Sequence, residues 1–245
     1  MNKFHLIMPM GGNGSRFSKC GFNLPKPLIS IYGKPFLYWS TMSILKFNDL
    51  VDLTFVVLKD HIENYHIDVE IKKYFPQANI IVLDHVLNGP VLTCLEGIKN
   101  IRDNLPILFN DCDHLFKSSQ FNNACKTNEI KDLDGALITF KSDLPQYSYV
   151  IYNGNKITGT IEKKVVSNDA ICGAYLFKNA DYFKKIAKIY FDSCMYKEFF
   201  ISGMYNEIAH SNGIIKTYPT DYHIPFGIPE EYEVAIKDKH YIELQ

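Results

Sequence analysis

The chain has 245 residues and a mass of 28.2 kDa, a length typical of one α/β domain, or of one domain with a small appended lobe. Its 26 lysines and arginines against 27 aspartates and glutamates leave a formal net charge of −1, so no overall field draws the protein to nucleic acid or anionic lipid. Any attraction for a charged ligand must therefore be local.

The six cysteines are scattered without a Cys-x-x-Cys pair, which argues against a zinc site or a disulfide framework and fits a reducing compartment. The apolar N-terminal stretch is too short for a signal peptide, and no run of about 18 apolar residues is present to span a membrane. We therefore expect a soluble, cytoplasmic protein with neither membrane insertion nor a nucleic-acid partner.

In the first half, short continuous apolar runs, typical of buried strands, alternate with apolar residues at helical spacing. The predicted strands cover residues 4–8, 53–58, 79–83 and 106–109, and the predicted helices cover 36–47, 62–75 and 90–101. This alternation predicts a parallel sheet with helices on both faces, in which ligands bind beyond the carboxyl ends of the strands.

The second half is richer in strands. The predicted strands cover residues 136–141, 149–152, 156–161, 170–177 and 214–218, and the predicted helices cover 180–191, 199–210 and the charged tail from Pro229. The turn Asn153-Gly154-Asn155 between two of these runs is a hairpin signal. No repeat or linker separates the halves, so we expect them to form one body.

A glycine-rich turn follows the first strand, with the sequence Gly11-Gly12-Asn13-Gly14-Ser15-Arg16-Phe17. Three glycines in four positions allow left-handed backbone and turn N–H groups toward one point, and a concavity lined by amides attracts phosphate. Arg16 and Lys26 would add positive charge. The turn therefore predicts a binding loop for a triphosphate, although a glycine turn at a strand end is often only a turn.

Two common phosphate motifs do not fit this loop. A Walker loop needs Gly-Lys-Ser/Thr at the start of a helix, whereas Lys26 stands between Pro25 and Pro27. A dinucleotide fingerprint needs a third glycine where Arg16 stands and a carboxylate about twenty residues on, where residues 32–34 are Tyr-Gly-Lys.

The remaining pattern, a strand, then Gly-Gly-x-Gly-Ser-Arg, then Pro-Lys-Pro-Leu, resembles the signature of the sugar nucleotidyltransferases, or nucleoside-diphosphate-sugar pyrophosphorylases. The similarity is greatest to members from bacterial capsule and surface-polysaccharide pathways. It implies a Rossmann-like GT-A/nucleotidyltransferase fold: a mixed, mostly parallel central sheet, helices on both faces and a small β-rich acceptor lobe. It also implies one domain, 1–245, with a nucleotide-binding half (1–115) and an acceptor-binding half (116–245).

Asp111 and Asp113 directly follow a predicted strand, and residues two apart in an extended segment project to the same side. Carboxylate oxygens suit Mg²⁺, which binds through one or two carboxylates plus substrate phosphates. In the family resembled here the aspartate at the position of Asp113 binds the metal, whereas the position of Asp111 varies. Aspartates that merely end the strand are the structural alternative.

The resemblance assigns further residues to the two substrates. The segment around Asn88 and Gly89 resembles the loop that lies against the nucleobase, although Gly-Pro is also an ordinary helix start. The implied nucleotide-binding residues are Met10, Gly11, Gly12, Asn13, Gly14, Ser15, Arg16, Lys26, Asn88, Gly89, Asp111 and Asp113.

On the acceptor side, the implied residues are Glu162, Lys163, Gly173 and, more weakly, Glu198. Neighbouring side chains on a regular strand point to opposite faces, so Glu162 and Lys163 can both serve one site only if the strand ends or bulges there. A solvated strand end is the structural alternative for this pair.

The segment from Gly227 resembles the family's Gly-Thr-Pro-Glu-Asp/Glu, before which many members carry a second metal-binding aspartate. Here Pro225 occupies that position. The second metal ligand is therefore open: Asp221 or Asp111 could substitute, or one carboxylate suffices.

We expect a nucleotidyltransferase that moves a nucleotidyl group from an NTP to a phosphorylated small-molecule acceptor, chiefly a sugar 1-phosphate, and releases pyrophosphate. Arg16, Lys26, Asp113 and Lys163 would be its catalytic residues and Mg²⁺ its cofactor. The alternatives are a cytidylyltransferase acting on a small non-sugar phosphate ester, a GT-A glycosyltransferase using Asp111 and Asp113, and a nucleotide-binding subunit without activity. The nucleobase and a homo-oligomeric state are left open.

Overall fold

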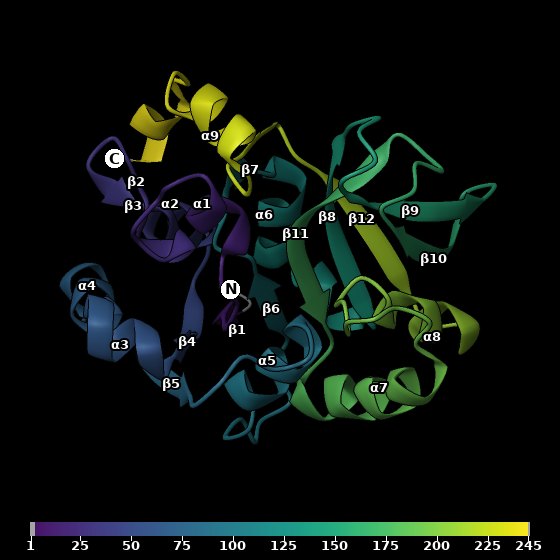
Figure 1. The fold of residues 1–245 in the computed structure, drawn as a ribbon. Coiled ribbons are helices and arrows are strands. Elements are labelled where there is room, and N and C mark those ends of the chain that lie inside the picture. Colours follow the sequence, from purple (N-terminus) through teal and green to yellow (C-terminus); the bar gives the residue numbers. More distant parts are fainter. Residues whose placement is uncertain (1–2, 245) are drawn as a thin grey trace.

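The computed structural model describes residues 3–244, which form a mixed α/β fold around a nine-stranded sheet (Figure 1). Its strands are β1 (Phe4–Met10), β4 (Leu50–Leu58), β5 (Asn79–Leu83), β6 (Ile107–Asn110), β8 (Gly135–Lys141), β9 (Ser148–Asn153), β10 (Lys156–Glu162), β11 (Asp169–Phe177) and β12 (Ile215–Pro219). The strand order is β10-β9-β11-β6-β1-β4-β5, with β8 beside β11 and β12 beside β8.

The N-terminal half of the sheet is parallel, as the alternation of strands and helices predicts. Strands β6, β1, β4 and β5 pair in parallel, so their carboxyl ends meet at one edge. Alternate residues of β1 enter two cores: Leu6 and Met8 face one, and Ile7 faces the other. Burial on both faces explains why these strands are continuous apolar runs.

Helices cover both faces of the sheet. The core that contains Leu6 packs against α2 (Phe36–Leu45), α4 (Ile67–Tyr74) and α6 (Ser119–Lys126). The core that contains Ile7 packs against α5 (Pro90–Gly97), α7 (Ala180–Ser193) and α8 (Met204–His210), which lie along the lower side of the view in Figure 1. The predicted two-sided arrangement is confirmed.

The C-terminal half of the sheet changes direction at β11, which pairs antiparallel with β6, β8 and β9. The predicted hairpin is present as β9 and β10, and β12 returns parallel to β8. The sheet therefore runs without interruption from the first half of the sequence into the second.

Three predicted helices differ from the structure. The helix expected over 62–75 is broken into α3 (Lys59–Tyr65) and α4 by His66, whose left-handed φ of 52° redirects the chain so that Ile67 and Ile71 are buried. The helix expected over 90–101 ends at Gly97. The helix expected over 199–210 begins only at Met204, because the backbone of Phe199 bonds across to the start of α5.

Several short elements had no clear sequence signal. They are α1 (Ser15–Lys19), β2 (Ser30–Ile31), β3 (Lys34–Pro35), β7 (His114–Lys117), α6 and β13 (Tyr222–Pro225), whereas α9 (Pro229–Ala235) confirms the helical tail. β13 pairs antiparallel with β7 and places Pro225 opposite His114. A third core then joins the tail to the first half through Phe17, Trp39 and Tyr241. These contacts bring the C-terminal segment beside the glycine-rich turn.

Within residues 3–244, the structure contains no helix that is both long and apolar enough to cross a membrane.

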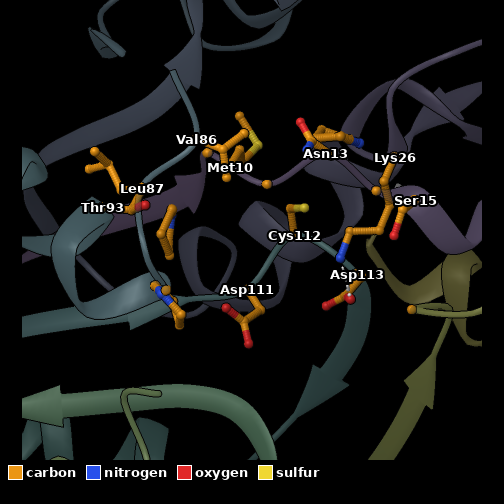
Figure 2. A pocket seen from close by; sticks show the side chains of 18 of the residues that line it. Met10, Asn13, Ser15, Lys26, Val86, Leu87, Thr93, Asp111, Cys112 and Asp113 are labelled. Atoms are coloured by element: carbon orange, nitrogen blue, oxygen red, sulfur yellow. Dashed lines mark hydrogen bonds and ion pairs between the residues drawn. The ribbon is translucent and has the colours of Figure 1, made fainter. Parts of the chain in front are cut away.

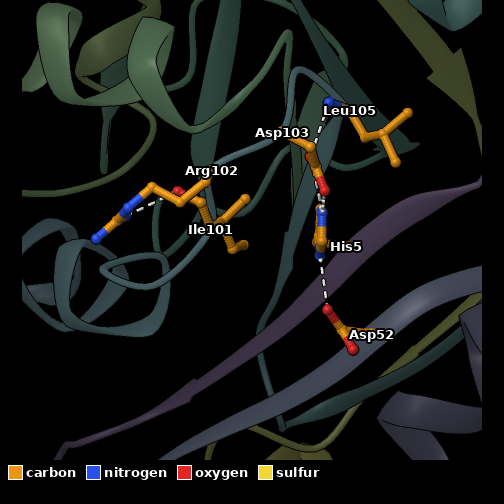
Figure 3. Close-up of polar contacts among 6 residues, drawn as sticks. All are labelled: His5, Asp52, Ile101, Arg102, Asp103 and Leu105. Atoms are coloured by element: carbon orange, nitrogen blue, oxygen red, sulfur yellow. Dashed lines mark hydrogen bonds and ion pairs between the residues drawn. The ribbon is translucent and has the colours of Figure 1, made fainter.

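The amino end of β1, opposite the glycine-rich turn, is fixed by a buried histidine. His5 is 3 % exposed, and its Nε2 lies 3.0 Å from Asp103 Oδ2 while its Nδ1 lies 3.3 Å from Asp52 Oδ2 (Figure 3). Asp103 also accepts a hydrogen bond from the backbone N of Leu105 at 3.0 Å. One carboxylate thus ties the loop before β6 to β1.

Asp103→Ala is expected to lower the free energy of unfolding by about 1–3 kcal/mol, because it leaves a buried imidazole N and a backbone N–H without their acceptor. Denaturant unfolding measures the change. The exposed Asp192, whose side chain makes no hydrogen bond or ion pair with residues 3–244, gives the control Asp192→Ala. Equal stabilities of the two variants would contradict the role of Asp103.

Candidate active site

The glycine-rich loop (residues 11–16) begins where β1 ends, at the carboxyl edge of the parallel strands. Asp111 and Asp113 follow β6, the neighbour of β1, and so reach the same edge. Cys112 between them is 4 % exposed and belongs to the core. Because neighbouring side chains of an extended segment point to opposite sides, both aspartates point away from that core. The predicted meeting of the loop and the aspartates is observed.

The side chain of Lys26 extends to Asp113, the second of the two aspartates. Lys26 begins a single 3₁₀ turn (Lys26–Leu28) whose start is fixed between Pro25 and Pro27, and its Nζ lies 2.7 Å from Asp113 Oδ2 (Figure 2). The two side chains are only 24 % and 22 % exposed, so water screens this ion pair weakly.

The pKa values follow from this pairing. Burial is the largest single influence and would raise the pKa of Asp113, but the Lys26 ammonium, together with His114 and Arg16, holds that pKa below its usual value. Burial likewise opposes the charge on Lys26, yet Asp113 raises the lysine pKa above its usual value. Both residues are therefore charged at neutral pH.

Asp111 lacks such a partner. Its burial, followed by the nearby Asp113 carboxylate, raises the pKa of Asp111 to about 7, although Lys26 opposes the shift. Lys26 forms an ion pair with only one of the two carboxylates. When both aspartates are ionised, their negative charge exceeds what Lys26 neutralises, and a divalent cation would balance it. Their oxygens are the donors that Mg²⁺ prefers, so Asp111 and Asp113 fit such an ion.

A cavity of about 560 Å³ opens over these groups (Figure 2). It is lined by the glycine-rich loop, residues 86–90, both aspartates and Lys26, and also by Met10, Thr93, Glu198 and Phe200. All the residues predicted to bind the nucleotide therefore line one cavity. A second cavity of about 160 Å³ lies beyond the aspartates, and Arg16, Asp111 and Asp113 line both.

The structure requires a glycine at position 89 for a reason other than the start of α5. Its φ of 98° and ψ of 163° lie in a region that essentially only glycine adopts, and an added Cβ would lie 2.4 Å from the backbone N of Phe199. The backbone N of Val91 donates to the Phe199 carbonyl at 3.0 Å. Gly89 therefore lets the loop that lines the cavity dock against residues 198–200.

The four predicted acceptor residues lie in different places. β10 ends at Glu162 and Lys163 follows with a left-handed φ of 54°, so the required break in the strand is present. Lys163 is exposed, with Nζ 5.4 Å from the ring centroid of Phe200. Glu162 Oε1 accepts hydrogen bonds from Ser148 and Ser202. Within residues 3–244, neither Glu162 nor Lys163 lines either of the two cavities described above.

The other two acceptor residues do line cavities. Glu198 lines the larger cavity and Gly173 the smaller one. Gly173 has a φ of 89°, and an added Cβ would lie 2.8 Å from Asp111 Oδ2, so this glycine leaves room for the carboxylate. Its carbonyl accepts a hydrogen bond from the backbone N of Asp111 at 2.9 Å.

Asp221 does not replace the missing second aspartate. It lies at the other end of the β7–β13 ribbon from Pro225, and it accepts hydrogen bonds from Ser119. The structure instead places Glu231 near this position: its Oε2 accepts from the backbone N of Gly227 at 2.8 Å, and its Oε1 from the Tyr147 hydroxyl at 2.6 Å. No sequence signal points to Glu231 beyond its place in the Pro-Glu-Glu segment.

Comparisons with known proteins agree with this geometry. The model of the nucleotidyl transferase family matches residues 5–216. The bifunctional protein GlmU of Aliarcobacter butzleri is 27 % identical over 223 residues, which cover 87 % of this chain and 47 % of that protein. The chain thus spans about half the length of that relative.

Solved structures show the same fold. A nucleoside-diphosphate-sugar pyrophosphorylase from Vibrio cholerae RC9 superposes with a TM-score of 0.81 at 20 % identity, covering 95 % of this chain and 100 % of that one. The inositol-1-phosphate CTP transferase from T. maritima superposes with a TM-score of 0.73 at 16 % identity, covering 97 % of each chain. The expected fold class is confirmed.

Proposed function

This chain belongs to the nucleotidyl transferase family, and from that premise we propose that it transfers a nucleotidyl group from an NTP to a sugar 1-phosphate and releases pyrophosphate. The observation that supports the proposal most is the convergence of the glycine-rich loop, Arg16, Lys26 and Asp113 on one cavity. A polyphosphate with its cation requires amides, fixed cations and a carboxylate in one place.

The glycine-rich loop binds the triphosphate through its backbone amides, and Arg16 stabilises the departing pyrophosphate. Lys26 neutralises charge at the α-phosphate. An oxygen of the acceptor phosphate attacks the α-phosphorus in line as the bond from that phosphorus to the bridging oxygen breaks. A phosphate monoester is largely dianionic at neutral pH, with a second pKa of about 6, so no general base is needed.

Asp113, with Asp111, would hold Mg²⁺. When bound, the ion supplies charge neutralisation along the polyphosphate. Lys26 Nζ lies 2.7 Å from Asp113 Oδ2, so the lysine and a cation held by Asp113 would compete for the charge of one carboxylate. Phosphate oxygens of a bound nucleotide would draw the Lys26 ammonium away from Asp113, so we expect the cation and the nucleotide to bind together rather than separately.

Lys26→Met is accordingly expected to raise the affinity of the nucleotide-free protein for Mn²⁺ at least about tenfold, or about 1.4 kcal/mol, because it frees Asp113 from a competing cation. Electron paramagnetic resonance of free Mn²⁺ measures this affinity. Lys188→Met, at an exposed site, is the control. An unchanged or weaker affinity of the Lys26 variant would show that the lysine does not compete with a cation.

On the acceptor side, Gly173 and Glu198 line the two cavities, and the exposed Lys163, beside Phe200 of the larger cavity, would extend its side chain to the acceptor phosphate. Glu162, which accepts hydrogen bonds from two serines, would hold the end of β10 in place beside that site. We propose one domain, with nucleotide bound by residues 1–115 and acceptor by residues 116–245. The role we assign is nucleotide-sugar supply for surface-polysaccharide or capsule synthesis in the cytoplasm. The similarity to an inositol-1-phosphate CTP transferase favours a non-sugar phosphate ester with CTP as the second candidate.

A pyrophosphate-release screen tests the proposal. Five NTPs are each incubated with Mg²⁺ and a panel of sugar 1-phosphates and phosphorylated polyols. We expect release from one NTP that depends on one acceptor. Release with a phosphorylated polyol alone would favour the second candidate. Nucleotide binding without release for any acceptor, or turnover of a nucleotide-sugar instead, would contradict nucleotidyl transfer.

A further inference from the structure

Two buried side chains and one half-buried side chain that no sequence motif links meet beside the smaller cavity. His114 begins β7, Cys172 lies in β11 and His223 lies in β13. One donor atom from each, a ring nitrogen or the sulfur, lies within 4.8 Å of the other two. The spacing of the cysteines and histidines along the chain does not indicate this cluster.

The sheet topology explains how the three side chains meet. β13 pairs with β7 so that Pro225, two residues after His223, lies opposite His114. The carbonyl of Gly173, the residue after Cys172, is bonded to the backbone N of Asp111, which precedes His114 by three residues. His114 and Cys172 are 2 % and 5 % exposed, yet all three side chains line the 160 Å³ cavity. A small ligand can therefore reach them.

His114 is held by an outer partner. Its Nε2 lies 3.0 Å from Asn110 Oδ1, and Asn110 Nδ2 donates to the Ser40 carbonyl at 3.0 Å. Because the amide nitrogen is used by Ser40, the amide oxygen faces the ring, and Nε2 must carry the proton. Asn110 therefore holds the His114 ring in one orientation from outside the cluster. Metal-binding histidines characteristically have such a partner on the second nitrogen.

His223 is the unbonded member of the cluster. Both of its ring nitrogens are buried and have no hydrogen-bond partner among the described residues. The ring packs on Phe140 with 4.0 Å between the centroids, a contact that satisfies neither nitrogen. A buried polar group without a partner costs about 1–3 kcal/mol, so this ring has a lone pair to offer a ligand.

We propose that His114, Cys172 and His223 form a binding site for a borderline-soft divalent metal ion of the Zn²⁺ type. Two imidazole nitrogens and one thiolate are the donors that such an ion selects, whereas Mg²⁺ prefers the oxygens of Asp111 and Asp113. The fourth position faces the cavity and is left for water or a ligand. On binding, the thiol proton is released to solvent.

The distances allow this coordination with a small adjustment. Zn–N bonds of about 2.0–2.1 Å and Zn–S bonds of about 2.3 Å put tetrahedral ligands about 3.4–3.6 Å apart. From the 4.8 Å limit, the donor atoms need to approach one another by at most about 1.2–1.4 Å. His223 can supply that movement, because no hydrogen bond holds its ring.

Titration of the metal-free protein with Co²⁺, followed by absorbance, tests the site. We expect one bound equivalent with a thiolate-to-Co²⁺ charge-transfer band. Cys172→Ser should abolish the band, and His223→Gln should lower the affinity at least tenfold. Zn²⁺ should raise the Tm of the wild-type protein but of neither variant.

Two control variants separate this site from its surroundings. Cys125→Ser changes a buried cysteine of α6, and Asp113→Asn removes a ligand of the proposed Mg²⁺ site; both should keep the band. Circular dichroism confirms that each variant folds, and if Cys172→Ser does not, His223→Gln still decides the outcome. Absence of the band in the wild-type protein, its persistence in Cys172→Ser, or unaltered affinity in His223→Gln would overturn the proposal. Pyrophosphate release with Mg²⁺ alone is assayed separately, so failure of one proposal leaves the other intact.

Discussion

Asp113→Ala is expected to lower the turnover of nucleotidyl transfer by at least about 10², the scale measured when one electrostatic group is removed from an active site. The carboxylate has two tasks in our proposal: it binds the cation, and it positions Lys26, whose Nζ lies 2.7 Å from its Oδ2. Removing it leaves a partly buried ammonium without its partner. Lys26→Ala should cause a loss of the same order, because the α-phosphate then loses its fixed positive charge.

Pyrophosphate release under saturating substrates measures both variants. Asp192→Ala and Lys188→Ala, at exposed positions outside both cavities, are the matched controls and should retain wild-type turnover. Asp113→Asn separates charge from shape, because the amide keeps the volume of the carboxylate. Near wild-type turnover in Asp113→Ala or Lys26→Ala would remove that residue from the mechanism.

Gly89→Ala is expected to lower the free energy of unfolding by at least about 3 kcal/mol. The backbone conformation alone costs about 1–3 kcal/mol for a residue with a Cβ. The added atom would also lie 2.4 Å from the backbone N of Phe199, so residues 86–90 and 198–200 must separate. Both segments line the larger cavity, so KM for the NTP should rise as well.

Denaturant unfolding measures this change, and Gly12→Ala is its control. A Cβ at Gly12 meets no atom within 4 Å, and Gly12 has no left-handed φ, so its stability should stay within about 0.5 kcal/mol of the wild-type value. Equal midpoints for the two variants would show that the docking of the two loops contributes little to stability.

The parts of the fold that the sequence predicts are those with a strong local signal. The strands of the parallel half are continuous apolar runs because both faces are buried, and the Asn-Gly turn sets the β9–β10 hairpin. Local patterns cannot show where tertiary contacts break a helix. His66 divides one helix to bury Ile67, and Phe199 leaves another to bond with residues 88–91.

In the candidate site, too, local sequence motifs are predicted and contacts between distant segments are not. The glycine-rich loop, Lys26 and the two aspartates are predicted because each lies at the end of a parallel strand or in a specific motif. The contact of Glu231 with Tyr147, the hydrogen bonds that two serines donate to Glu162, and the meeting of His114, Cys172 and His223 join segments that are separated in the sequence. Only the antiparallel pairing of β13 with β7 and the turn of the sheet at β11 create those contacts.

The most direct test of the account is a crystal structure of the protein with Mg²⁺ and a non-hydrolysable NTP analogue. We predict a triphosphate over the glycine-rich loop, with Arg16 and Lys26 Nζ on phosphate oxygens, and with the Asp113 carboxylate on the cation in place of the lysine. A nucleotide bound elsewhere, with the ion pair between Lys26 and Asp113 still intact, would contradict it.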